Sequence, residues 1–133
     1  WTAVEQERIN LFADATGDHQ WIHLDRARAQ AESPYKDTIA HGFLTLSLLP
    51  ALTREVQDGG SPYPGTKLAV NYGLNRVRFP SPVKVNSRVR SRTVLKEVSE
   101  VGDALQLVRE VTVEVEGQDK PACVAETLTR LYF

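Results

Sequence analysis

The segment 42–56 is the part of the chain that most constrains the fold, because it has the spacing of a helix and almost no polar face. Its apolar residues are Phe43, Leu44, Leu46, Leu48, Leu49, Ala51, Leu52 and Val56. A helix that is apolar on nearly every side must be covered by the rest of the domain. At a rise of about 1.5 Å per residue it would be roughly 21 Å long, close to the length of a strand layer. We therefore expect a sheet wrapped around this helix, with a bend or a lost hydrogen bond at Pro50.

The rest of the pattern places a helix first and strands afterwards. Apolar residues at three- and four-residue steps predict an amphipathic helix at 4–15, capped by Thr2 and ended by Gly17. After a loop at 57–65, strands are predicted at 67–73, 87–96, 104–116 and 122–133. One face of the third strand carries Leu105, Leu107, Val111, Val113 and Val115. This order indicates an α+β fold in which the long central apolar helix packs on the concave face of a curved antiparallel sheet.

Length and composition exclude several classes of protein. The 133 residues fit a single domain, 1–133, and a net charge of −1 gives no general attraction for nucleic acid. No apolar run is long enough for a membrane span. Cys123 is the only cysteine, so no intrachain disulfide can form, and we expect a packed core thiol in a cytoplasmic protein. Because the chain begins at Trp1, an upstream segment that was removed stays an open alternative.

A polar loop at 16–25 concentrates groups that can act in catalysis. Asp18 and His23 lie five residues apart, and a carboxylate and a neutral imidazole can converge on one water molecule, hold it and transfer its proton. The spacing leaves a structural alternative equally open. Asp18 would then bond backbone amides of the turn, and His23 would be an ordinary histidine. We interpret His19 as a surface residue.

A second motif, IAHG at 39–42, directly precedes the apolar helix. Unpaired N–H groups at a helix start can bind a carbonyl oxygen that gains negative charge, and Gly42 has no side chain to obstruct it. The alternative is that Gly42 permits close packing and that His41 bonds a backbone carbonyl. Spacing alone does not decide between these two interpretations.

Three motifs together resemble a known family. The runs FADATGDHQWIHLD at 12–25 and IAHGFLT at 39–45 resemble the MaoC-like (R)-specific enoyl-CoA hydratases. The run NYGLNRVRFPSPV at 71–83 is similar to the nodulation-protein-N-like branch of that family, which includes mycobacterial single-domain hydratases. The resemblance implies a hot-dog fold and a homodimer with active sites near its interface. It assigns the catalytic dyad to Asp18 and His23 and the N–H that binds the thioester carbonyl to Gly42.

The chain departs from the family pattern at one place that bears on substrate choice. Gln20 and Trp21 replace the commoner Asn-Pro pair, which leaves both dyad positions unchanged but puts a bulky indole beside the acyl pocket. His41, Asn71 and Tyr72 are further candidates for lining that pocket.

The expected enzyme is a hydro-lyase that adds water reversibly and syn to a trans-2-enoyl thioester, giving the (R)-3-hydroxyacyl thioester. Coenzyme A or acyl carrier protein would be part of the substrate, and no metal or redox cofactor is required. A hot-dog acyl-CoA thioesterase and a non-catalytic acyl-thioester binding module are the alternatives. The sequence leaves open the acyl chain length, the carrier, the direction, the pathway, and which of Asp18 and His23 is the base. We interpret Arg88, Arg90 and Arg92 as an exposed strand face.

Overall fold

The computed structural model describes residues 1–56 and 62–133, so part of the predicted loop at 57–65 lies outside the described residues. The elements are β1 (Thr2–Ala3), α1 (Gln6–Thr16), α2 (Trp21–Leu24), α3 (Arg26–Glu32), α4 (Gly42–Ser47), α5 (Leu49–Val56), β2 (Leu68–Arg78), β3 (Arg88–Val101), β4 (Ala104–Val115) and β5 (Cys123–Tyr132). No helix among these residues is long and apolar enough to span a membrane.

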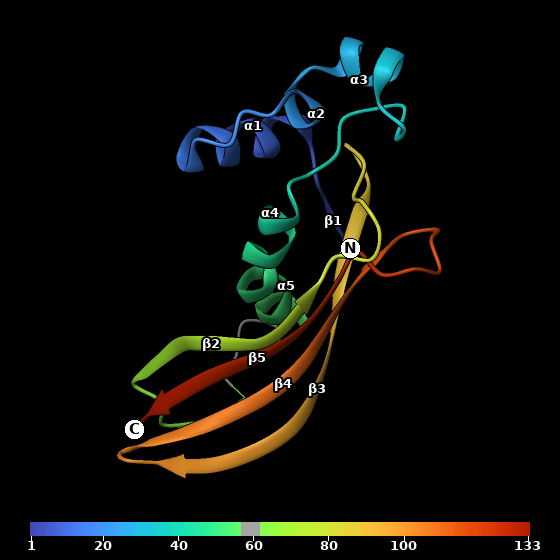
Figure 1. Cartoon of the computed structure of the whole chain (residues 1–133). Coiled ribbons are helices and arrows are strands. Elements are labelled where there is room, and N and C mark those ends of the chain that lie inside the picture. The colour runs from blue at the N-terminus through green and yellow to red at the C-terminus, as the bar shows by residue number, and fades with distance from the viewer. Residues whose placement is uncertain (57–61) are drawn as a thin grey trace.

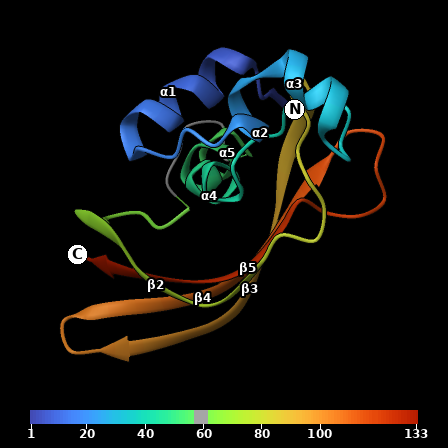
Figure 2. The same ribbon diagram turned by 45° about the horizontal axis from the view of Figure 1, so that its top comes forward.

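The strands form one antiparallel sheet in the order β1-β3-β4-β5-β2. The sheet is strongly curved, and α4 and α5 lie on its concave side (Figure 1). Figure 2 shows α4 and α5 nearly end-on, between the sheet and the group formed by α1, α2 and α3. The predicted α+β fold, with an apolar helix covered by a curved antiparallel sheet, is confirmed.

The central helix is divided in two rather than continuous from 42 to 56, which corrects the prediction of a single helix. Helix α4 ends at Ser47 and α5 begins at Leu49. The Leu48 N–H bonds the carbonyl oxygens of Leu44 at 3.1 Å and Thr45 at 3.3 Å, so the last turn of α4 is tightened. Pro50 has no N–H with which to continue the helical ladder, which explains the break and agrees with the bend expected there.

The core lies between α1, the central helices and the concave face of the sheet. Ile9 of α1 is completely buried and packs in the same cluster as Leu44 and Leu52. The strands contribute Val89, Val111, Val113, Val115, Cys123 and Ala125. The alternation predicted for the third strand is therefore confirmed, and so is the core position of Cys123. Burial raises the pKa of the Cys123 thiol to about 11.

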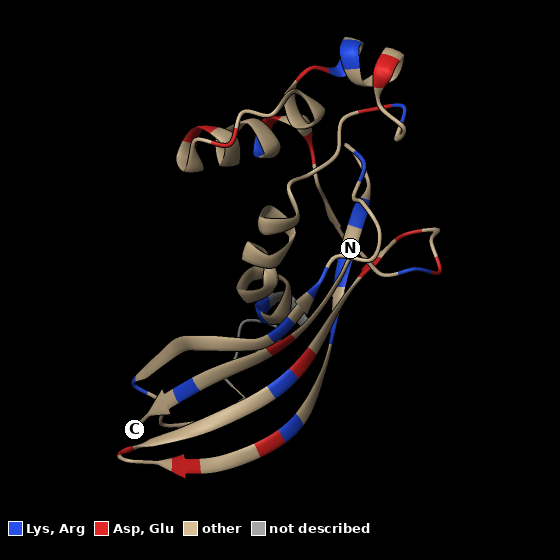
Figure 3. Cartoon of the chain, in the orientation of Figure 1, with Lys and Arg blue, Asp and Glu red and all other residues tan. Residues whose placement is uncertain are grey.

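The convex face of the sheet is charged. Figure 3 shows basic and acidic positions side by side on β3 and β4. Arg88 bonds Glu116, Arg90 Nε lies 2.7 Å from a Glu114 oxygen, and Arg92 Nη2 lies 2.6 Å from the other Glu114 oxygen. The prediction that these three arginines form an exposed strand face is confirmed.

Two predicted details near the N-terminus are wrong. Thr2 does not cap the first helix: it pairs with Val89 in the short edge strand β1, and α1 begins only after Glu5. The polar segment that carries His23 is not wholly loop, because Trp21–Leu24 forms the short helix α2. Gly17 does end α1, in the left-handed conformation with φ of 79°.

Candidate active site

A turn at the end of α1 leads the chain toward the site. The Gly17 N–H donates to the Ala13 carbonyl at 2.8 Å, and the left-handed conformation of Gly17 ends the helix directly before Asp18. The Asp18 carboxylate is exposed and accepts a hydrogen bond from the Gln20 N–H at 3.3 Å. Asp18 therefore makes the turn contact that the structural alternative expected, and one of its oxygens has additional acceptor capacity.

His23 has a defined tautomer because of its backbone contact. Its side chain is buried, with 6% exposed, and its Nδ1 lies 2.7 Å from the Ile39 carbonyl oxygen. A carbonyl only accepts, so Nδ1 carries the hydrogen and the neutral ring offers Nε2 as an acceptor. Burial lowers the pKa of His23 below its ordinary value of 6.5, and nearby His41 lowers it further, against the opposing effects of the Ile39 bond and Asp18. The ring therefore stays neutral in the folded protein at neutral pH.

His41 joins the two predicted catalytic residues. Its ring is 2% exposed and stacks on the ring of His23, with centroids 3.8 Å apart and planes 25° apart. Its Nε2 donates to the backbone carbonyl of Asp18 at 3.0 Å. Among the described residues, its buried Nδ1 has no partner. The sequence indicated His41 only as a pocket residue, and its place directly before Gly42 was the one signal available.

One atom from each of Asp18, His23 and His41 lies within 4.8 Å of the other two. Such a set invites comparison with a metal site, where ligand lone pairs must converge on one ion. The two imidazole planes are stacked with 25° between them, so their in-plane lone pairs run side by side instead of approaching one ion from well-separated directions. The arrangement fits better with a water molecule held by hydrogen bonds than with a metal ion in this ring geometry.

Gly42 begins α4, where it combines close packing with a backbone N–H that is unpaired among the described residues. A Cβ atom at this position would lie 3.0 Å from the ring of Phe79, so any other residue would require that ring to shift. No described carbonyl or side chain accepts a hydrogen bond from the Gly42 N–H. The N–H is thus one of the unpaired donors of a helix start.

The other candidates lie in different places. Trp21 is half-buried beneath the guanidinium of Arg28, 4.1 Å from the ring centre. Tyr72 lies under Arg130, with 3.4 Å between the guanidinium carbon and the ring centre. Asn71 lines a cavity of about 550 Å³ between α5 and the sheet, and neither Trp21 nor Tyr72 lines that cavity.

Two other polar groups lie outside this cluster. His19 is exposed and bonds Asp14 at 2.9 Å, outside the cluster of Asp18, His23 and His41. Arg109 of β4 lines the same large cavity, and sequence reasoning missed it. Its signal was a charged residue at a position that the strand alternation assigns to the apolar face.

Comparisons with known proteins show the family of the chain. The model of the MaoC-like domain matches residues 1–118. The chain belongs to the MaoC-like dehydratase family. It is 55% identical over 131 residues to 3-hydroxyacyl-thioester dehydratase Z of Mycobacterium tuberculosis, covering 98% of this chain and 83% of that protein. It is 49% identical over 134 residues to nodulation protein N of Rhizobium leguminosarum, covering 100% of this chain and 81% of that one.

A solved structure supports the fold directly. The R-hydratase of Pseudomonas aeruginosa superposes with a TM-score of 0.73 at 25% identity, covering 98% of this chain and 76% of that one. The hot-dog fold and the family resemblance are therefore confirmed, as is the prediction of an enzyme family of hydratases and dehydratases.

The pKa values of His19 and His23 should lie on opposite sides of the ordinary value of 6.5. Burial lowers the pKa of His23, whereas the hydrogen bond to Asp14 raises the pKa of exposed His19. Between pH 6.5 and the lower pKa of folded His23, the unfolded chain binds more protons than the folded chain. The free energy of unfolding should therefore decrease as the pH falls through this window. Titration of the ring signals by NMR measures both values, with Asp14→Asn as a control that should lower the pKa of His19 alone. A His23 pKa at or above 6.5 would contradict the buried neutral ring.

Proposed function

We propose that this protein is a 3-hydroxyacyl-thioester dehydratase that also catalyses the reverse reaction, the (R)-specific hydration of trans-2-enoyl thioesters. The observation that carries the proposal is the convergence of Asp18, His23 and His41 within 4.8 Å. A relative of 55% identity has the printed name 3-hydroxyacyl-thioester dehydratase, which supports the same chemistry here. The proposed reaction is the same whether the acyl group is carried by coenzyme A or by acyl carrier protein.

The mechanism uses Asp18 and His23 as one proton-transferring pair. A water molecule held between them attacks the β-carbon of the enoyl thioester and gives one proton to the pair. The pair returns one proton to the α-carbon on the same face, so the net change is addition of H and OH across the double bond. The neutral His23 ring, with Nε2 as an acceptor, suits the removal of a proton from water.

The start of α4 stabilises the charge that develops during this addition. Attack at the β-carbon moves electron density onto the thioester oxygen, giving an enolate. The Gly42 N–H, which has no described acceptor, is the donor for that oxygen. The backbone of α4 already fixes the direction of this N–H, so no group has to reorient when the enolate forms.

His41 acts as a positioning residue in this scheme. Its ring supports one face of His23, and its N–H fixes the backbone of Asp18. Asp18 lies in the turn after α1 and His23 lies in α2, and the His41 side chain contacts both. This placement holds their separation constant when substrate enters.

The outer edge of β2 supports a homodimer. Among the described residues the sheet ends at β2, whose exposed apolar residues are Leu68, Val70, Tyr72 and Leu74. A long exposed edge strand is a template for pairing with another chain. We therefore include in the proposal a dimer in which two copies of β2 pair and continue the sheet across a twofold axis.

Activity with crotonyl-CoA tests the dyad. Asp18→Asn and His23→Gln should each lower kcat/KM by about 10²- to 10⁴-fold, because each removes one proton-transferring group. His19→Gln on the same loop is the matched control and should keep activity. Loss of enoyl absorbance measures hydration, while a thiol reagent measures free coenzyme A. Release of thiol would indicate a thioesterase, and absence of any reaction with short and medium chains would indicate a binding module.

A proline substitution tests the Gly42 N–H without removing the helix. Proline is tolerated at the first helical position and lacks the N–H, and His41 has the extended backbone that precedes proline, with φ −58° and ψ 138°. Because a side chain at this position would come within 3.0 Å of the Phe79 ring, the test uses the Phe79→Ala background, in which that contact is removed. Gly42→Pro should lower kcat about 10²- to 10³-fold relative to Gly42→Ala in that background. Equal activity of the two variants would exclude this donor from the reaction.

Sedimentation measures the proposed dimer. The double substitution Val70→Lys with Leu74→Lys should convert a dimeric wild type to monomers, because paired β2 strands would bring the lysines together in the interface. Val94→Lys on β3 places the same charge on another exposed strand position and should leave the dimer intact. A monomeric wild type, or a double variant that stays dimeric, would contradict the β2 interface.

A further inference from the structure

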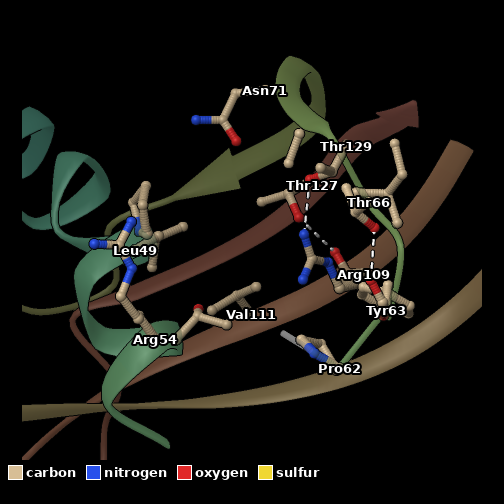
Figure 4. A pocket seen from close by; sticks show the side chains of 14 residues that line it. Leu49, Arg54, Pro62, Tyr63, Thr66, Asn71, Arg109, Val111, Thr127 and Thr129 are labelled. Carbon is tan, nitrogen blue, oxygen red and sulfur yellow. Dashed lines mark hydrogen bonds between the residues drawn. The ribbon is translucent and has the colours of Figure 1, made fainter. Parts of the chain in front are cut away.

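A cavity on the inner side of the sheet is separate from the cluster of Asp18, His23 and His41. It has a volume of about 550 Å³ and lies between α5 and the concave face of β2, β4 and β5. Figure 4 shows Arg54 on one side of it and Arg109 with two threonines on the other. Its apolar walls include Leu49, Pro50, Val111 and Leu131, and its polar groups include Asn71, Thr127 and Thr129.

Arg109 is the unusual residue of this cavity. On the inner face of β4 it stands next to Leu107 and Val111, both of which are buried. Its Nη2 donates to the Thr129 hydroxyl at 2.7 Å, but its Nε is buried and has no partner among the described residues. A guanidinium donor without an acceptor in a low-dielectric surrounding is unfavourable. The cavity therefore supplies a positive charge and a directed donor that the described protein does not satisfy.

The rest of the lining makes the cavity positive. Arg54 of α5 contributes a second guanidinium, and none of the described lining residues is acidic. Neither arginine has an ion pair among the described residues. By contrast, Arg88 and Arg90 on the convex face bond glutamates. Two guanidinium groups without an ion pair among the described residues, beside hydroxyl groups, are complementary to an anionic oxygen group.

The cavity continues toward the start of α4. A second cavity of about 450 Å³ is lined by Leu46 and Ser47 of α4 and by Gly73 and Leu74 of β2. The two cavities share Leu49, Pro50, Asn71 and Thr127. On α4 the lining of the second cavity starts at Leu46, about 6 Å of helical rise after Gly42. The two adjoining cavities thus extend between largely aliphatic walls from Leu46 to Arg109 and give space for an acyl chain.

We propose that Arg109, assisted by Arg54, binds a carboxylate at the distal end of the acyl chain, so that the enzyme prefers ω-carboxyacyl thioesters. This inference rests on the proposed function for the identity of the substrate. A planar carboxylate accepts two parallel hydrogen bonds from a guanidinium, and the aliphatic walls match the methylene groups before it. The phosphates of coenzyme A are the other source of anionic oxygen, and they lack an aliphatic chain that would fit these walls.

The test compares pairs of trans-2-enoyl-CoA substrates of increasing length, one ending in methyl and the other in carboxylate. At the length that reaches Arg109, the wild type should show a kcat/KM about tenfold or more higher for the carboxylate form. Arg109→Gln should remove this preference, because it should lower kcat/KM for the carboxylate form more than for the methyl form. Arg109→Lys should retain part of it. Arg54→Gln changes an exposed residue, so folding is preserved, and it should reduce the preference.

Arg92→Gln on the convex face is the matched control and should keep the wild-type ratio. The proposal is overturned if the wild type shows no preference at any length, or if Arg109→Gln retains it. It is also overturned if Arg109→Gln lowers both forms equally, because that result would indicate contact with coenzyme A or a purely structural role.

A binding measurement separates this proposal from the proposed function. Octanoate should raise the melting temperature of the wild type more than the neutral octanamide does, and Arg109→Gln should abolish the difference. If no enoyl thioester is hydrated but this difference is present, the anion site stands and the hydratase proposal fails. If octanoate produces no greater shift than octanamide, the anion site is overturned whatever the activity.

Discussion

Burial of α4 between the curved sheet and α1 determines where the polar groups of the site lie. The sheet must curve to cover an apolar helix on one side, and α1 must cover it on another. The beginning of α4 is then held against the turn that follows α1. Backbone donors at the helix start, His41 and the Asp18 turn consequently meet in one place without needing long side chains to reach each other.

The pair of stacked histidines shows how a polar cluster is tolerated next to this core. His23 and His41 are both buried, and each donates one ring N–H to a backbone carbonyl. These bonds compensate for part of the desolvation of two polar rings and select their tautomers. Because these backbone bonds orient the two rings, they also set the positions of the remaining ring nitrogens. Preorganisation of this kind is what general acid–base chemistry requires.

The sequence was sufficient for features that depend on local pattern. The apolar helix, the alternating strand at 104–116 and the end of α1 at Gly17 follow from periodicity and from the conformational range of glycine. Features that depend on contacts far apart in the chain were not accessible. Strand β1 exists because Thr2 meets Val89, and His41 reaches Asp18 and His23 only when α4 docks beside the turn. The three motifs indicated the site, whereas the third member of the cluster required the tertiary structure.

The buried thiol of Cys123 provides a way to observe how the sheet opens. It lies on β5 opposite Val113, is completely buried, and has a pKa raised to about 11. Near neutral pH it is neither ionised nor reachable by reagents in the native state. Alkylation of the only cysteine in the chain therefore reports transient separation of β5 from the helices that cover it. The same inertness means that thiol reagents added to the folded protein detect small-molecule thiols without a background from the chain itself.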